Sequence, residues 1–92
     1  LYNVPARTAL NMADDTNAHL ARLPRIGGEK DAAADLVHVS TLRKKAGNKF
    51  LQISGEDMTA VAFNAMGGVG CISVSSNVAP KRCVAVQAAM MK

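Results

Sequence analysis

The chain has 92 residues and a formal net charge of +4, with 49% hydrophobic, 20% charged and 3% aromatic residues. This length allows one small domain that would bury about 60 to 65% of its unfolded surface, and the scarcity of aromatic side chains predicts an aliphatic core. No stretch approaches the roughly 18 apolar residues of a membrane helix. The positive charge is not accompanied by an aromatic stacking platform, so we expect neither a membrane nor a nucleic acid as a partner.

The cysteines and the ends of the chain further restrict the class of protein. Cys71 and Cys83 show no CxxC spacing and no neighbouring pair of histidines, so we expect two reduced, buried cysteines and neither a disulfide framework nor a metal site. The first residues include neither an initiator methionine nor a basic n-region. The last apolar pattern has no helix stop signal. We therefore expect a piece from within a longer protein.

The first half of the chain predicts a strand end, a helix, and then a strand. Pro5 ends a strand-like tip in YNVP, and Asp14 and Asp15 open a helix that Pro24 stops. Residues 26–30 follow as a short strand, although its two glycines and its glutamate are poor strand formers. The order of these elements is typical of an α/β protein.

The second half predicts three more helices and two more strands. Apolar residues at spacings of three and four indicate a helix over 32–46, and KFLQISG follows as a buried parallel strand. A second apolar stripe predicts a helix over 58–66. The run GCISVS predicts a strand over 70–75, and a last helix is expected over 81–92.

This alternation predicts a parallel sheet with right-handed crossovers, either doubly wound or a segment of a (β/α)8 barrel. The glycines at 67, 68 and 70 lie between a helix and the next strand, whereas a dinucleotide fingerprint lies between a strand and the next helix. We therefore interpret them as a tight turn. Polar residues gather instead at the carboxyl ends of the predicted strands, where active sites of α/β proteins lie.

Four segments carry a family resemblance. The segments YNVPARTALNM, GEKDA, LQISGED and GGVGCISVSSNVAP occur in this order, with a lysine 28 positions after the first tyrosine. Together they resemble the dihydrodipicolinate synthase family, of the N-acetylneuraminate lyase superfamily and the class I aldolase type. The resemblance spans essentially the whole chain. It implies that residues 1–92 are a single partial domain, the second half of a (β/α)8 barrel from the tip of the fifth strand to the eighth helix.

The resemblance also implies roles for five residues. Lys30 matches the lysine that forms a Schiff base with pyruvate, and Tyr2 matches the tyrosine that shuttles protons. Arg7 matches the arginine that holds the carboxylate of aspartate semialdehyde, and Gly55 and Ile72 match positions that line the pyruvate site. A lysine that points into an apolar barrel has its charged form disfavoured by desolvation, which makes the neutral nucleophile more accessible.

The function implied for the whole protein is the condensation of pyruvate with L-aspartate 4-semialdehyde in the diaminopimelate route to lysine. The resemblance implies no cofactor, a cytoplasmic location and a homotetramer. The family also uses a threonine and a second tyrosine that this chain does not include, so we expect the piece alone to be inactive. Two alternatives remain open, namely a sibling pyruvate-dependent aldolase (N-acetylneuraminate lyase or a 2-keto-3-deoxy-sugar-acid aldolase) and a half-barrel without catalysis.

Two residues next to Lys30 depart from the family pattern. Gly27 and Glu29 stand where the family has aliphatic residues. Because side chains alternate along a strand, we expect Lys30 to face the inside of the barrel and Glu29 to face the helices. A buried carboxylate is costly unless it is paired, protonated or hydrated. His19 and His38 match no catalytic motif, and we expect them at the surface or in helix packing.

Overall fold

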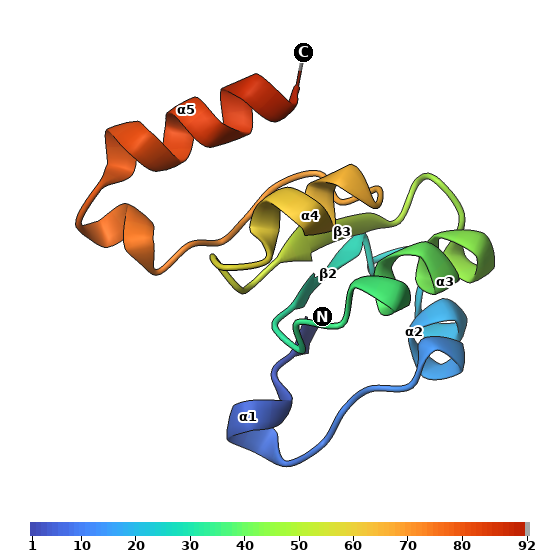
Figure 1. Cartoon of the computed structure of the whole chain (residues 1–92). Coiled ribbons are helices and arrows are strands. Elements are labelled where there is room, and N and C mark those ends of the chain that lie inside the picture. Colours follow the sequence, from blue (N-terminus) through green and yellow to red (C-terminus); the bar gives the residue numbers. More distant parts are fainter. Residues whose placement is uncertain (92) are drawn as a thin grey trace.

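The computed structural model describes residues 1–91, which form a three-stranded parallel sheet with helices (Figure 1). The strands lie in the order β1 (Tyr2–Asn3), β2 (Gly28–Asp31), β3 (Leu51–Ser54). The helical elements are α1 (Pro5–Thr8), α2 (Asp14–Leu20), α3 (Leu36–Ala46), α4 (Ala60–Ala65), the 3-10 turn η1 (Ser75–Asn77) and α5 (Pro80–Met90). The predicted α/β class with a parallel sheet is confirmed. None of the helices has the length and apolar character needed to cross a membrane in the part of the chain described.

The register of the sheet is set by the central strand β2. Tyr2 pairs with Lys30, and Lys30 pairs in turn with Ile53. The strand was expected over 26–30 but begins two residues later, because the Ile26 N–H donates to the Leu23 carbonyl at 3.1 Å and so remains in the turn after α2. β2 also continues one residue further, to Asp31.

The helices begin later or end earlier than their apolar patterns indicate. α2 ends at Leu20 rather than near Pro24. α3 begins at Leu36 rather than at Ala32, because the Asp35 carboxylate accepts hydrogen bonds from the first free N–H groups of the helix. α4 covers Ala60–Ala65, which is shorter than the expected 58–66. In the last helix, the expected end at Lys92 lies outside the described residues.

The prediction of a strand over 70–75 is wrong. Cys71 forms a single parallel bridge with Ser54, and the backbone then leaves the sheet. The Asp57 carboxylate accepts the N–H groups of Val74 and Ser75 at 3.0 and 2.9 Å. These two donors are therefore not free for a ladder, and the segment continues into the turn η1.

The core lies between the sheet and the helices α2 and α3. Leu42 of α3 is fully buried against Ala18 of α2 and Phe50. Phe63 of α4 is also buried, so both phenylalanines of the chain contribute to a core that was expected to be aliphatic. Cys71 and Cys83 are free thiols but only half-buried, so the expectation that both are buried is wrong.

The helix α5 contributes no buried residue, and Figure 1 shows it at the far end of the chain from β1. It contacts α4 through a hydrogen bond from Asn64 Nδ2 to Gln87 Oε1 at 2.9 Å. Val84 remains 67% exposed. The outer edge of β1 has no neighbouring strand within residues 1–91. The chain therefore presents both an open sheet edge and uncovered apolar side chains.

We expect the isolated 92-residue chain to associate, since pairing of open edges and burial of apolar side chains both favour contacts between copies. Light scattering after size exclusion should show a mass that rises with concentration. The thermal midpoint should also depend on concentration. A monomer at all concentrations with a sharp, concentration-independent melt would contradict this expectation.

Candidate functional site

The pleat of β2 places its side chains alternately on two faces of the sheet. Glu29 accepts a hydrogen bond from Asn17 of α2 and lies against His38 of α3, so it faces the helices. Lys30 lies on the other face, where its Nζ is 4.1 Å from the centroid of the Tyr2 ring. The expectation that Glu29 faces the helices and Lys30 faces the opposite side is confirmed.

Three of the five predicted site residues lie together on the face opposite the helices. Tyr2 and Lys30 are direct neighbours in the sheet, so their side chains emerge side by side. A Cβ atom at Gly55 would lie 2.9 Å from Lys30 Cε and 3.0 Å from Ala32 Cβ. The absence of a side chain at Gly55 therefore makes room for the side chain of Lys30.

The other two predicted residues, Arg7 and Ile72, follow β1 and lie beside the end of β3, respectively. Ile72 is 51% exposed and donates its backbone N–H to the Ser54 carbonyl at 2.8 Å, beside the end of β3. Arg7 lies on α1, directly after β1, and its side chain is exposed. It makes no side-chain hydrogen bond or ion pair to any residue within 1–91. The guanidinium is therefore free to receive an anion.

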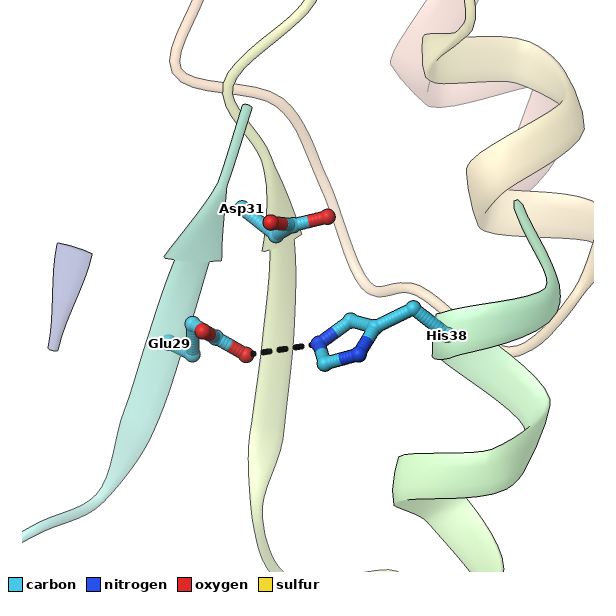
Figure 2. A group of neighbouring side chains, drawn as sticks. All are labelled: Glu29, Asp31 and His38. Carbon is cyan, nitrogen blue, oxygen red and sulfur yellow. Dashed lines mark hydrogen bonds and ion pairs between the residues drawn. The ribbon is translucent and has the colours of Figure 1, made fainter. Parts of the chain in front are cut away.

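A buried polar cluster occupies the opposite, helix-facing side of β2 (Figure 2). Glu29 is 2% exposed, and its two oxygens contact Asn17 Nδ2 at 2.9 Å and His38 Nε2 at 3.2 Å. The other imidazole nitrogen, Nδ1, is paired with Asp14 at the start of α2. The carboxylate that the strand pattern places among the helices is therefore paired.

These contacts determine the charge of the histidine. The hydrogen bond with Glu29 is the largest influence, and with Asp14 it raises the pKa of His38 to about 9 against the opposing effect of burial. The ring is thus an imidazolium at neutral pH. Sequence reasoning assigned His38 only to the surface or to helix packing. The signal that could have indicated its role is a glutamate in a buried strand position followed by a histidine in the next helix.

Asp31 is the second buried carboxylate on this face. Its Oδ1 accepts from Asn3 Nδ2 at 2.8 Å and from the Ala33 N–H at 3.3 Å. Asn3 also accepts the Met12 N–H through Oδ1 at 3.0 Å. Burial raises the pKa of Asp31 above its ordinary value, despite the Asn3 hydrogen bond. Asn3 and Asp31 thereby join β1, β2 and the segment before α2.

A third polar centre, Asp57, holds the segment after the Cys71 bridge. Besides two backbone N–H groups, its carboxylate accepts from the Ser75 hydroxyl at 3.0 Å. The Ser73 hydroxyl and the Ser75 backbone lower the pKa of Asp57 to about 2. Beside it, α4 and α5 border an open, mainly apolar groove of about 470 Å³.

Comparison with known proteins identifies the family. The sequence profile of the dihydrodipicolinate synthetase family matches residues 1–92. The chain belongs to this family. It is 53% identical over 91 residues to the 4-hydroxy-tetrahydrodipicolinate synthase of Ruegeria pomeroyi, covering 99% of this chain and 31% of that protein. It is 56% identical over 81 residues to the enzyme of the same name from Zymomonas mobilis, covering 88% of this chain and 28% of that protein.

Solved structures of dihydrodipicolinate synthases share the fold of the chain. The Aquifex aeolicus structure superimposes with a TM-score of 0.94 at 31% identity, over 98% of this chain and 31% of that one. The chloride-inhibited Acinetobacter baumannii structure, complexed with pyruvate, gives 0.93 at 40% identity, over 99% of this chain and 31% of that one. The chain thus spans about 31% of the length of these dihydrodipicolinate synthases.

The pairing of Glu29 with His38 predicts a double-mutant result. The His38→Leu variant should unfold about 3 to 5 kcal/mol more easily, because it leaves a buried carboxylate without its charged partner. The Glu29→Ile, His38→Leu double variant should recover most of this loss, because two apolar side chains need no partner. Urea unfolding of these two variants and of Glu29→Ile, all at one protein concentration, measures the coupling free energy between Glu29 and His38. Additive effects of the two substitutions would show that the pair does not interact.

The lowered pKa of Asp57 predicts a pH dependence with a defined sign. The folded pKa is about 2 and lies below the ordinary value of 3.8. The stabilising contribution should therefore be complete above about pH 4 and should disappear as the pH falls through 2. The difference in unfolding free energy between wild type and Asp57→Asn, measured from pH 6 down to 2, checks this. A difference that stays constant down to pH 2 would contradict it.

Proposed function

We propose that residues 1–92 are one partial domain, the second half of a (β/α)8 barrel from the tip of the fifth strand through the eighth helix. Membership of the family supports this proposal, as do the parallel strand order and the coverage of about 31% of the related synthases. In a closed barrel, the face of β2 that carries Lys30 would line the interior, and the open edge of β1 would be paired.

We further propose that the whole protein condenses pyruvate with L-aspartate 4-semialdehyde through a Schiff base on Lys30, as a step towards diaminopimelate and lysine. The observation that carries this proposal is the placement of Lys30 beside Tyr2, on the face away from the helices, with Gly55 leaving room for its side chain. The A. baumannii relative is described as complexed with pyruvate, which supports the substrate class.

The proposed chemistry begins with attack of the neutral Lys30 amine on the carbonyl carbon of pyruvate. Loss of one water molecule from the carbinolamine leaves the imine. These steps require a proton to leave the nitrogen and another to reach the departing oxygen, and Tyr2 is the group beside the lysine that can relay them. The enamine that forms from the imine then attacks the aldehyde carbon of the second substrate.

Arg7 is assigned to the carboxylate of aspartate semialdehyde. Its planar guanidinium can hold a carboxylate with two parallel hydrogen bonds. The exposed position of Arg7, directly after β1, supports this assignment. Gly55 and Ile72 are proposed to line the pyruvate site at the ends of neighbouring strands. The whole protein is proposed to act as a cytoplasmic homotetramer without a cofactor, and the 92-residue chain alone is proposed to be inactive.

Borohydride trapping in the full-length protein tests the central residue. Incubation with pyruvate and borohydride should reduce an imine and add mass to the peptide that contains Lys30. The Lys30→Ala variant should not be labelled. The matched control is Lys45→Ala, because Lys45 is an exposed lysine paired with Asp15 at 2.7 Å, and this variant should be labelled like wild type. Trapping at another lysine in Lys30→Ala would reject the assignment.

Three further variants separate the roles of the neighbouring residues. Tyr2→Phe should keep the fold and slow trapping by about 10² to 10⁴-fold, because it removes a proton relay. Gly55→Val should reduce trapping because its side chain takes the space of the lysine. Arg7→Ala should trap pyruvate normally and lose kcat/KM for aspartate semialdehyde. Comparison of aldehydes in the wild type then distinguishes this synthase from a sibling aldolase.

A further inference from the structure

The helix-facing cluster contains three groups that can bind a metal ion. One carboxylate oxygen each from Glu29 and Asp31 and one imidazole nitrogen of His38 all lie within 4.8 Å of one another. All three side chains are buried, with exposures of 2%, 3% and 7%. Figure 2 shows both carboxylates on the side of β2 that faces the histidine of α3. These groups therefore converge on one small volume inside the protein.

Each of the three groups is also held by a partner through its other polar atom. Asn17 donates to Glu29 Oε1, and Asn3 donates to Asp31 Oδ1, as described above. Asp14 is paired with His38 Nδ1. Such outer hydrogen bonds are typical of metal sites, where a carboxylate fixes the histidine ring and amides orient the carboxylate ligands. The atoms that take no part in these outer hydrogen bonds are Glu29 Oε2 and His38 Nε2, which contact each other at 3.2 Å, and Asp31 Oδ2.

Two buried oxygens of this cluster have no hydrogen-bond partner within residues 1–91. Asp31 Oδ2 and Asn17 Oδ1 are inaccessible to solvent and accept no hydrogen bond from any group within residues 1–91. Buried polar atoms in proteins are nearly always satisfied, so an unpaired buried carboxylate oxygen is an atom that a bound water or ion can satisfy. The second unpartnered oxygen belongs to the Asn17 amide, whose nitrogen donates to Glu29.

The charges of the cluster also favour a cation. Three carboxylates, those of Asp14, Glu29 and Asp31, surround a single imidazole, and in the described part of the chain no lysine or arginine forms an ion pair with them. Lys30, the residue between the two strand carboxylates, lies on the opposite face. The cluster therefore contains more carboxylates than basic side chains.

We propose that Glu29, Asp31 and His38 bind a divalent transition-metal ion of the zinc type. Imidazole nitrogen with carboxylate oxygen is a donor set that zinc accepts, whereas magnesium and calcium prefer oxygen alone. Two ligands of a tetrahedral zinc are about 3.3 Å apart, and Glu29 Oε2 and His38 Nε2 are already 3.2 Å apart. Asp31 supplies the third ligand atom, which lies within 4.8 Å of those of Glu29 and His38.

The site has a structural role and goes beyond the proposed function. Its ligands come from β2 and α3, so the ion fastens this helix to the central strand of the sheet. It lies on the face away from Lys30 and takes no part in the reaction. Binding of the ion therefore stabilises the folded chain, and it replaces the proton that His38 Nε2 shares with Glu29.

Zinc binding by the untagged chain tests this proposal. After treatment with a chelator and dialysis, the 92-residue chain should take up one equivalent of Zn²⁺ by calorimetry and elemental analysis, and its thermal midpoint should rise. Mg²⁺ at the same concentration should produce neither effect. Co²⁺ should give the visible absorption of a site with nitrogen and oxygen ligands.

Three variants test whether Zn²⁺ uptake depends on the proposed ligands. His38→Gln and Asp31→Asn should each lose stoichiometric uptake, and Asp31→Asn retains the shape of the carboxylate so that it still folds. The control is His19→Gln, because His19 is the other histidine of the chain and is exposed; this variant should bind like wild type. Circular dichroism checks that each variant is folded. If the 92-residue chain aggregates, the metal content of the full-length protein is measured instead. No uptake by folded wild type, or equal uptake by all variants, would overturn the proposal.

Discussion

The alternation of side chains along β2 is the constraint on which the rest of this structure depends. In four residues the strand sends Glu29 and Asp31 towards the helices and Lys30 towards the opposite face. A shift of the register by one residue would exchange these faces and would bury the lysine among the helices. The pairing of Tyr2 with Lys30 and of Lys30 with Ile53 holds this register from both sides.

The two faces of β2 place different physical requirements on the side chains that they carry. On the helix side, ionisable groups are removed from water and must be compensated, so Glu29 is tied to His38 and Asn17, and Asp31 is tied to Asn3. On the other face, Gly55 leaves space for the Lys30 side chain, and the Tyr2 ring lies beside the Lys30 amine. The same short strand thus supplies both a buried polar network and the proposed catalytic amine.

The periphery is held less firmly than this centre. The Cys71 bridge and the Ile72 N–H hydrogen bond to the Ser54 carbonyl join this segment to β3, and from there Asp57 directs it into a turn. Helix α5 follows with no buried residue. The related synthases are about three times as long as this chain, so further elements are present in those proteins. The open edge of β1 and the exposed face of α5 are consistent with a segment that folds as part of a larger unit.

The sequence by itself determined the local features of the protein. Apolar spacing and strand alternation predicted the parallel α/β class and the opposite faces of Glu29 and Lys30, because these depend on the period of the backbone. Only the tertiary structure decided that His38 pairs with Glu29, that Gly55 makes room for Lys30, and that the run after Gly70 leaves the sheet. Each of these depends on groups that are distant along the chain but adjacent in space, such as Asp57 and Ser75, which no local pattern records.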